Sequence, residues 1–156
     1  MDVHTKEQRS RNMAAIHNKD SKPELLLRSY LFQQGFRYRK NVQSLPGKPD
    51  IVLPKYRTVI FVNGCFWHGH NGCRYFQWPE TNQAFWERKI SDNIARDAKS
   101  RTLLNEDGWN VIVVWECELR KDVRNQTFTR VNEILTTQLL QESHKEDCPN
   151  QSSASK

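Results

Sequence analysis

The sequence predicts an α/β sandwich, in which helices flank a small mixed central β-sheet. Two apolar runs rich in β-branched residues, 58–62 and 109–116, have the composition of buried strands. The segments around them have the lengths and the spacing of apolar residues that are typical of helices. The chain has 156 residues, which suits a single domain with one substantial core.

The ends of the predicted helices are marked by particular residues. A short basic helix is expected from Thr5 to about Asn18. The next helix begins at Ser21, where Ser21, Pro23 and Glu24 form a capping-box pattern, and it ends at Gly35. Its expected buried stripe consists of Leu25, Leu26, Leu27, Tyr30 and Leu31. Two further helices are predicted at about 81–107, ended by Gly108, and at about 126–141.

The remaining segments complete the predicted domain. Residues 36–41 alternate apolar and basic side chains, as a half-exposed strand does, and 50–53 form another short strand. Residues 63–79 show no helical or strand period and are predicted to be a loop. We therefore predict one domain over 1–142, of which 1–18 is a basic arm, and a disordered polar tail over 143–156.

Composition narrows the class of partner. The net charge of +6 and the pI near 9.3 favour a polyanion such as nucleic acid, although a merely basic surface would have the same composition. The sequence lacks an apolar run of the ~20 residues that span a membrane. The N-terminus has no apolar core of a secretory signal, so we expect a cytoplasmic protein. In that reducing compartment cysteines are metal ligands or free thiols, and Cys148, in the polar tail, is expected to be a spare.

Three cysteines and a histidine have the spacing of a zinc site. Cys65, His70 and Cys73 lie within nine residues, and Cys117 follows a predicted strand. Four such ligands satisfy tetrahedral zinc and leave no open position, so the zinc is expected to be structural. The alternative is a set of separate thiols with a surface histidine. His68 competes with His70 for the ligand role, and spacing alone does not choose between them.

An acidic residue at a strand tip suggests a catalytic metal. Asp50 begins a short strand, and metal-dependent nucleases place a Mg²⁺-binding carboxylate in such a position. The main-chain carbonyl of Val62, at the tip of the neighbouring strand, could add a ligand. The alternatives are structural: Pro-Asp is a common turn signal. Glu24 completes a capping box, or else it faces the metal at Asp50 and holds its water.

His68 is the candidate general base, because a neutral imidazole can accept a proton from water near neutral pH. Asp97 could orient it, since Asp97 shares a helical face with Ile90 and Ile94. Spacing alone favours a different partner for Asp97, namely a salt bridge to Arg101 one turn on.

Two adjacent aromatics within the same loop suggest contact with bases. Phe66 and Trp67 lie between Cys65 and His68, in a segment too polar to bury both rings easily. They could insert between bases, or they could cover the zinc cluster. Met13, on the basic first helix, could be a second wedge, or it could pack beside Ile16.

Four segments closely resemble the very short patch repair endonucleases. They are RSRNMAAI (9–16), LPGKPD (45–50), VNGCFWHGH (62–70) and VVWEC (113–117). The similarity runs from about residue 3 to residue 140. It implies a restriction-endonuclease-like fold and an enzyme that nicks DNA 5′ of the thymine in T·G mismatches, which arise when 5-methylcytosine deaminates.

The resemblance also implies roles for single residues. Asp50 is similar to the family's central Mg²⁺ ligand, with the main chain of Val62 beside it. His68 resembles the catalytic base and Asp97 its partner, while Glu24 contacts water held by the metal. The implied zinc ligands are Cys65, His70, Cys73 and Cys117.

The same resemblance implies how the protein holds DNA. Phe66 and Trp67 are similar to major-groove intercalators beside the mismatch, and Met13 enters from the minor-groove side. Arg9, Arg11 and Asn12, in the matching N-terminal segment, are expected DNA contacts. The implied partners are double-stranded DNA with a T·G mismatch and, functionally, a cytosine-5 DNA methyltransferase. We expect a monomer in the bacterial cytoplasm, acting at the nucleoid, because a cut in one strand needs one active site.

Three departures from the family pattern stand out. Val62 occupies a position where Thr is frequent, and Asn63 one where His is common, so a second catalytic imidazole is missing. One extra residue separates His70 from Cys73. The (D/E)xK pattern of the wider superfamily is not evident either. Two other hypotheses are a restriction-type or sequence-specific nicking nuclease on the same scaffold, and a non-catalytic zinc-stabilised DNA-binding module.

Overall fold

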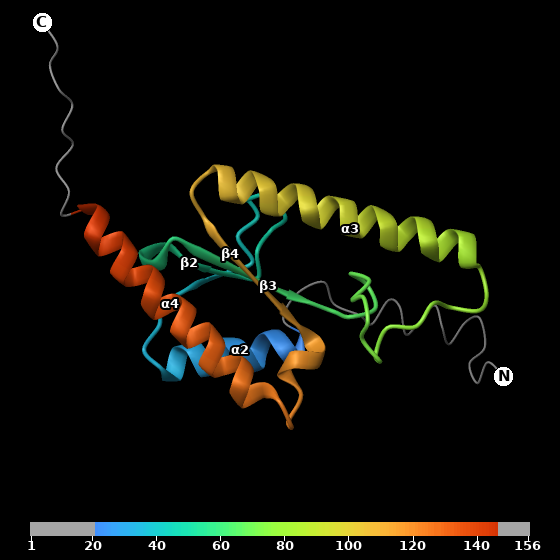
Figure 1. The fold of residues 1–156 in the computed structure, drawn as a ribbon, viewed down its shortest axis with the longest axis horizontal. Helices are drawn as coiled ribbons and strands as arrows, with labels where there is room; N and C mark the ends of the chain where they lie inside the picture. Colours follow the sequence, from blue (N-terminus) through green and yellow to red (C-terminus); the bar gives the residue numbers. More distant parts are fainter. Residues whose placement is uncertain (1–20, 147–156) are drawn as a thin grey trace, which may run out of the picture.

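The computed structural model describes residues 21–146. The predicted helix over 5–18 and the last ten residues, 147–156, lie outside that range. The described elements follow one another in the order shown in Figure 1. The helices are α2 (Lys22–Gln33), α3 (Gln83–Glu106) and α4 (Arg124–Glu146), with short 3-10 turns η1 (Pro54–Tyr56) and η2 (Glu116–Leu119). The strands are β1 (Arg39–Lys40), β2 (Ile51–Leu53), β3 (Thr58–Asn63) and β4 (Asn110–Trp115).

The four strands form one mixed sheet in the order β1-β2-β3-β4. β1 and β2 are antiparallel, as are β2 and β3, because short turns join them. β3 and β4 are parallel, and the long helix α3 provides the crossover between them. The predicted mixed α/β architecture is therefore confirmed for the described part of the chain. None of the described helices combines the length and hydropathy that a bilayer crossing requires.

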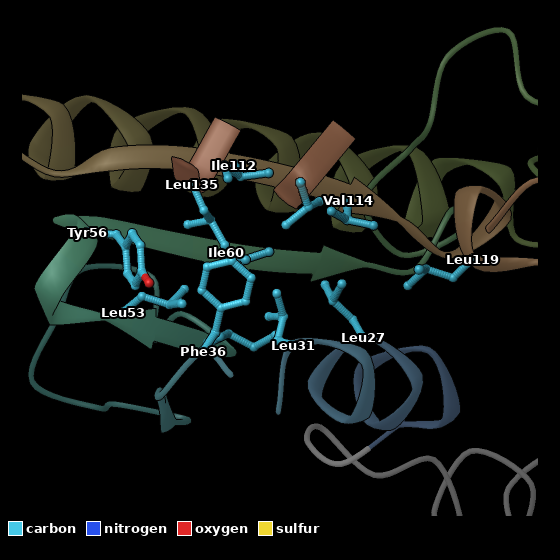
Figure 2. Packing of buried hydrophobic residues seen from close by; sticks show 12 residues of the cluster. Leu27, Leu31, Phe36, Leu53, Tyr56, Ile60, Ile112, Val114, Leu119 and Leu135 are labelled. Atoms are coloured by element: carbon cyan, nitrogen blue, oxygen red, sulfur yellow. The ribbon is translucent and has the colours of Figure 1, made fainter. Parts of the chain in front are cut away.

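Helices cover both faces of the sheet, α3 on one side and α2 with α4 on the other (Figure 1). Successive strand residues point to opposite faces, so each strand contributes to two cores. Ile60 and Val114 belong to the larger core, where they pack with Leu27 and Leu31 of α2 (Figure 2). Val59 belongs to the smaller core, which Leu104 of α3 completes. Because both faces of the sheet are buried, the strands consist of nearly continuous apolar residues.

The helix period corrects the predicted stripe of α2. Leu27 and Leu31 are fully buried, but Leu25 and Leu26 are 51% and 37% exposed, so their predicted burial is wrong. The inner face of α2 instead carries Glu24 and Arg28 in addition to Leu27 and Leu31. Successive residues of a helix are turned by about 100°, so the run 25–27 spans about 200° and cannot all face inward. Two polar residues thus occupy core positions next to the sheet.

Two element boundaries also differ from the prediction. β1 is only two residues long, because the Phe36 amide donates to the carbonyl of Leu31 at the end of α2. The alternation of burial still holds, since Phe36 is buried and Arg37 is exposed. α4 continues to Glu146, past its predicted end at Gln141 and into the segment expected to be a tail.

Candidate active site and metal centre

A cleft of about 910 Å³ opens between the start of α2, the end of β3, the loop after β3 and one face of α3. Its walls include Glu24, Val62, His68 and Asp97, which come from four separate segments. The structure therefore brings together the residues that the sequence suggested for catalysis. The other residues lining the cleft are Ser21, Pro23, Gly47, Gly64, Trp67, Phe85, Trp86, Lys89, Asn93, Arg96, Ser100 and Glu116.

Asp50 is joined to this wall through its carboxylate. The main-chain N–H of Val62 donates to Oδ2 of Asp50 at 2.7 Å, across the β2–β3 pair. The carbonyl of Asp50 accepts from the amide of Asn41, which fixes the backbone just before β2. Burial raises the pKa of Asp50 from 3.8 to about 7, and the negative charge of Glu24 adds to the rise, while the Val62 N–H and Arg28 oppose it.

Glu24 lies in the first turn of α2 and is only 4% exposed. Ser21 caps the helix by accepting from the Glu24 N–H, as predicted. The Glu24 side chain points to Arg28, one helical turn further along α2. Its Oε2 accepts a hydrogen bond at 2.7 Å from Nη2 of Arg28. Glu24 also forms a hydrogen bond with the Asp50 carboxyl group.

His68 and Asp97 are hydrogen-bonded in the cleft. Nδ1 of His68 lies 2.6 Å from Oδ2 of Asp97, and the two side chains are 29% and 28% exposed. Asp97 therefore pairs with His68, whereas spacing alone favoured a salt bridge to Arg101. Because the two residues come from the β3–α3 loop and from α3, their meeting depends on how the loop folds back on the helix.

The three cysteines and His70 form a separate cluster. One ligand atom from each of Cys65, His70, Cys73 and Cys117 lies within 4.8 Å of the others. His70 Nδ1 is 3.5 Å from the Cys117 sulfur, whereas His68 faces Asp97. The tertiary structure thus answers the question that spacing left open, since His70 joins the thiols and His68 the cleft.

The donor set of this cluster fits zinc. Zinc is held tetrahedrally by sulfur at about 2.3 Å and by imidazole nitrogen at about 2.0 Å, so its ligand atoms lie close together. Burial, followed by the neighbouring Cys65 and Cys73, raises the pKa of the Cys117 thiol to about 12. Three thiolates at such separations repel one another, and a divalent cation removes that repulsion.

The loop that carries these residues packs tightly on α3. Gly69 has a positive φ of 58°, and a Cβ there would lie 2.8 Å from the Ile90 side chain and 2.9 Å from that of Ile94. Only glycine permits both the conformation and the close approach. The His70 ring stacks on Trp115 of β4, with ring centroids 4.0 Å apart. His70 thus contacts the Cys/His cluster and Trp115, whereas His68 contacts Asp97 in the cleft.

Phe66 and Trp67 belong to a larger aromatic cluster that was not predicted from the sequence. Phe66 and Trp67 both contact Trp86 in the first turn of α3, at centroid distances of 5.3 and 5.8 Å. Phe85, beside Trp86, is 59% exposed. Trp67 lines the cleft together with Phe85 and Trp86. The Trp115 ring stacks on His70 of the Cys/His cluster.

A polar stripe on α3 continues from these aromatics along the cleft. Lys89, Asn93, Arg96 and Ser100 all line it, at the spacing of one helical face. Asn93 also donates to the main-chain carbonyl of Trp67 at 2.8 Å, which ties the loop to the helix. The spacing of these residues after Trp86 was the sequence signal that could have identified them.

The oxygen donors of the cleft fit a hard divalent cation. Asp50 and Glu24 offer carboxylate oxygens close enough for their charges to interact, and Mg²⁺ prefers oxygen ligands. The repulsion within this pair is relieved by a cation. Asn63, which replaces the family's common histidine, is 6% exposed. It lines a small second cavity with Asp97 and Arg101.

The fold and the cleft define a class of protein. Paired carboxylates, a histidine oriented by an aspartate and a basic helix face are the groups that hydrolases use on phosphodiesters. A family model described as DNA mismatch endonuclease Vsr matches residues 1–74. The chain is 49% identical over 119 residues to the DNA mismatch endonuclease Vsr of Escherichia coli K12, covering 76% of each protein. It therefore belongs to the Vsr family of DNA mismatch endonucleases.

Two similar relatives carry a different description. A type II nicking enzyme of Neisseria meningitidis serogroup A is 54% identical over 76% of this chain and 84% of its own length. A type II nicking enzyme of Xanthomonas oryzae is 47% identical over 72% of this chain and 82% of its own length. The predicted DNA contacts Arg9, Arg11, Asn12 and Met13 fall within the matched residues 1–74 but outside the described part of the structure.

Proposed function

We propose that this endonuclease nicks one DNA strand 5′ of the thymine in T·G mismatches produced by deamination of 5-methylcytosine. The observation that carries the proposal is the meeting of Glu24, Val62, His68 and Asp97 around one cleft, with Asp50 bound to Val62. Membership of the Vsr family supports mismatched DNA as the substrate. Double-stranded DNA with one mispaired thymine is thus the ligand for which the cleft is proposed.

His68 is the proposed general base. Asp97 accepts from Nδ1 of His68, so that Nε2 carries the lone pair and can take a proton from the attacking water. Asp97 also stabilises the imidazolium that results, as the acid of a catalytic triad does. The proton therefore moves from water to Nε2 while the water oxygen attacks phosphorus, and the bond between phosphorus and the leaving oxygen of the DNA strand breaks.

Asp50 and Glu24 are the proposed metal-site residues, Asp50 as direct ligand and Glu24 through water. The carbonyl of Val62 is proposed as a further ligand at the same point. Magnesium bound there would polarise the scissile phosphate and stabilise the charge on the leaving oxygen. The Val62 N–H holds Oδ2 of Asp50, which orients the carboxylate toward the end of β3.

The aromatic cluster is the proposed mismatch reader. Phe66 and Trp67 would enter from the major groove, with Trp86 supporting both rings, and Met13 would enter from the minor-groove side. A wobble pair costs less to unstack than a matched pair, so insertion of rings favours mismatched sites. Arg9, Arg11 and Asn12 are proposed contacts of the basic arm 1–18.

The Cys65, His70, Cys73 and Cys117 cluster is proposed to hold structural Zn²⁺. Its role would be to keep the loop that bears both the wedge and His68 in one conformation. We further propose that the sandwich is restriction-endonuclease-like and that the chain forms one endonuclease domain, which extends to the end of α4 at Glu146. The protein would act as a cytoplasmic monomer at the nucleoid, alongside a cytosine-5 DNA methyltransferase.

A restriction-type nicking nuclease is the second candidate. The relatives that are named type II nicking enzymes favour it. The two functions share the same cleft and differ in what the wedge requires of the DNA. Sequence-directed cutting would act on the matched duplex, whereas mismatch repair needs the mispaired thymine.

An assay on four end-labelled duplexes distinguishes these functions. T·G, C·G, T·A and A·C versions of the same site would be incubated with Mg²⁺, with each strand followed separately. The expected result is one nick, 5′ of thymine, in the T·G duplex. Equal nicking of C·G or T·A would favour the restriction-type nuclease. Binding without nicking, unchanged by Asp50→Ala, would support a non-catalytic module instead.

A further inference from the structure

Arg28 is buried directly beside the acidic residues of the cleft. Its exposure is 3%, that of Glu24 is 4%, and Nη2 of Arg28 lies 2.7 Å from Oε2 of Glu24. The positive charge of Arg28 also acts on the carboxylate of Asp50. Arg28 does not line the cleft, whereas Glu24 does.

The position of Arg28 on α2 makes its burial unusual. The same inner face of the helix carries Leu27 and Leu31, which are fully buried in the larger core. An apolar residue at position 28 would continue that core, whereas a buried ion pair commonly costs about as much desolvation energy as it returns. Packing alone does not account for an arginine here.

The geometry does account for a role in the site. Tyr38 donates to the main-chain carbonyl of Arg28, which anchors this turn of α2. The guanidinium holds one carboxylate oxygen of Glu24, and the Glu24 side chain also hydrogen-bonds to Asp50. Two like charges this close repel one another, and a fixed positive charge beside them offsets that repulsion.

We propose that Arg28 is a positioning residue of the active site, which holds the Glu24 carboxylate in place and offsets the negative charge of the Glu24–Asp50 pair. This inference rests on the proposed function, in which the pair serves the catalytic metal. Its consequence is a compromise. Arg28 lowers the attraction of the pair for a cation but keeps both carboxylates in the geometry that the reaction needs.

The test uses Arg28→Met and Arg28→Lys in the full-length protein. The first quantity is the Mg²⁺ dissociation constant of the DNA-free protein, measured by titration calorimetry after dialysis against magnesium-free buffer. The second is the single-turnover nicking rate at saturating Mg²⁺ on a T·G duplex. Leu31→Ala is the matched control, because it creates a cavity on the same face of α2 without touching Glu24.

Arg28→Met is expected to bind Mg²⁺ about threefold more tightly and yet to nick about tenfold more slowly. Arg28→Lys keeps the charge but not the planar fork, so its Mg²⁺ affinity is expected to match wild type while its rate falls about threefold. Leu31→Ala is expected to lower the Tm and to leave both quantities unchanged in the folded protein.

Two results would overturn the inference. One is a folded Arg28→Met protein whose Mg²⁺ affinity or nicking rate equals that of wild type. The other, decisive if Arg28→Met does not fold, is Arg28→Lys with an unchanged rate. Failure of the proposed function is recognised separately, because wild type would then not nick the T·G duplex at all. The Mg²⁺ affinities would still show in that case whether Arg28 offsets the charge of the pair.

Discussion

Nδ1 of His68 lies 2.6 Å from Oδ2 of Asp97, although the two residues are 29 positions apart. The contact links the loop after β3 to the middle of α3, and the same loop contributes three residues to the Cys/His cluster. A single segment thus carries the candidate base, the candidate structural metal site and the candidate wedge. A substitution at one of these three sites is therefore expected to affect the other two.

The first prediction concerns Asp97. Asp97→Asn keeps the shape of the side chain but allows the amide to donate to Nδ1, which selects the wrong tautomer of His68. We expect the nicking rate to fall about 100-fold or more, with the Tm and zinc content close to wild type. Single-turnover kinetics at several pH values measure the effect. Arg101→Ala is the control, and equal rates for the two variants would contradict the assignment.

The second prediction concerns the Cys/His cluster. Metal analysis of the purified protein is expected to find about one zinc per chain, and none after Cys65→Ser with Cys73→Ser. The double variant is expected to lose stability, because the cluster joins the loop to Cys117 of η2. Cys148→Ser is the matched control and should retain the zinc. A full zinc content in the double variant would show that the metal is held elsewhere.

The third prediction concerns the aromatic cluster. Replacement of Phe66 and Trp67 by Ala is expected to remove the preference for T·G over matched duplex. Trp86→Ala is expected to weaken that preference, since Trp86 supports both rings. Each stacked ring contributes about 1–3 kcal/mol, so preference should fall about tenfold per ring. Phe32→Ala removes an aromatic that is 59% exposed on α2 and serves as control. Competition binding measures the ratio of the affinities for T·G and matched duplex. An unchanged ratio would show that the rings serve only packing within the protein.

The fourth prediction concerns the pH dependence of stability. Burial and then Glu24 raise the pKa of Asp50 from 3.8 to about 7, so the folded protein binds this proton more tightly than the unfolded chain. The stability contributed by the protonated carboxyl is therefore complete below pH 3.8 and is lost as the pH rises toward 7. Because solvent still reaches the carboxyl, we expect metal-free Asp50→Asn to exceed wild type by about 2 kcal/mol at pH 8.

Denaturant melts at pH 5 and pH 8 measure that difference, which should shrink toward the lower pH. Magnesium is expected to stabilise wild type but not Asp50→Asn at pH 8, because the variant lacks the carboxylate. Equal stability of the two proteins at pH 8 without magnesium would show that the surroundings of Asp50 do not disfavour its ionised form.

Local signals in the sequence predicted most of the fold. Ser21 and Pro23 marked the start of α2, Gly108 the end of α3, and the apolar runs marked β3 and β4. These signals act over a few residues, through capping, backbone restriction and burial, so they can be read without knowing the fold. The predicted buried stripe of α2 was wrong at Leu25 and Leu26, which face outward. That prediction followed the run of apolar residues and not the helical period.

The sequence by itself determined which residues are chemically able to act: a strand-tip aspartate and, in one loop, two histidines and two cysteines. The family resemblance implied that His70 joins the thiols and that His68 pairs with Asp97, and the tertiary structure brings these side chains together. Only the tertiary structure placed Trp86 against the loop and the Glu24–Arg28 pair beside Asp50. The reason is physical. Spacing along the chain fixes contacts within a helix turn or a short loop, whereas contacts between segments depend on how α2 and α3 pack on opposite faces of the sheet.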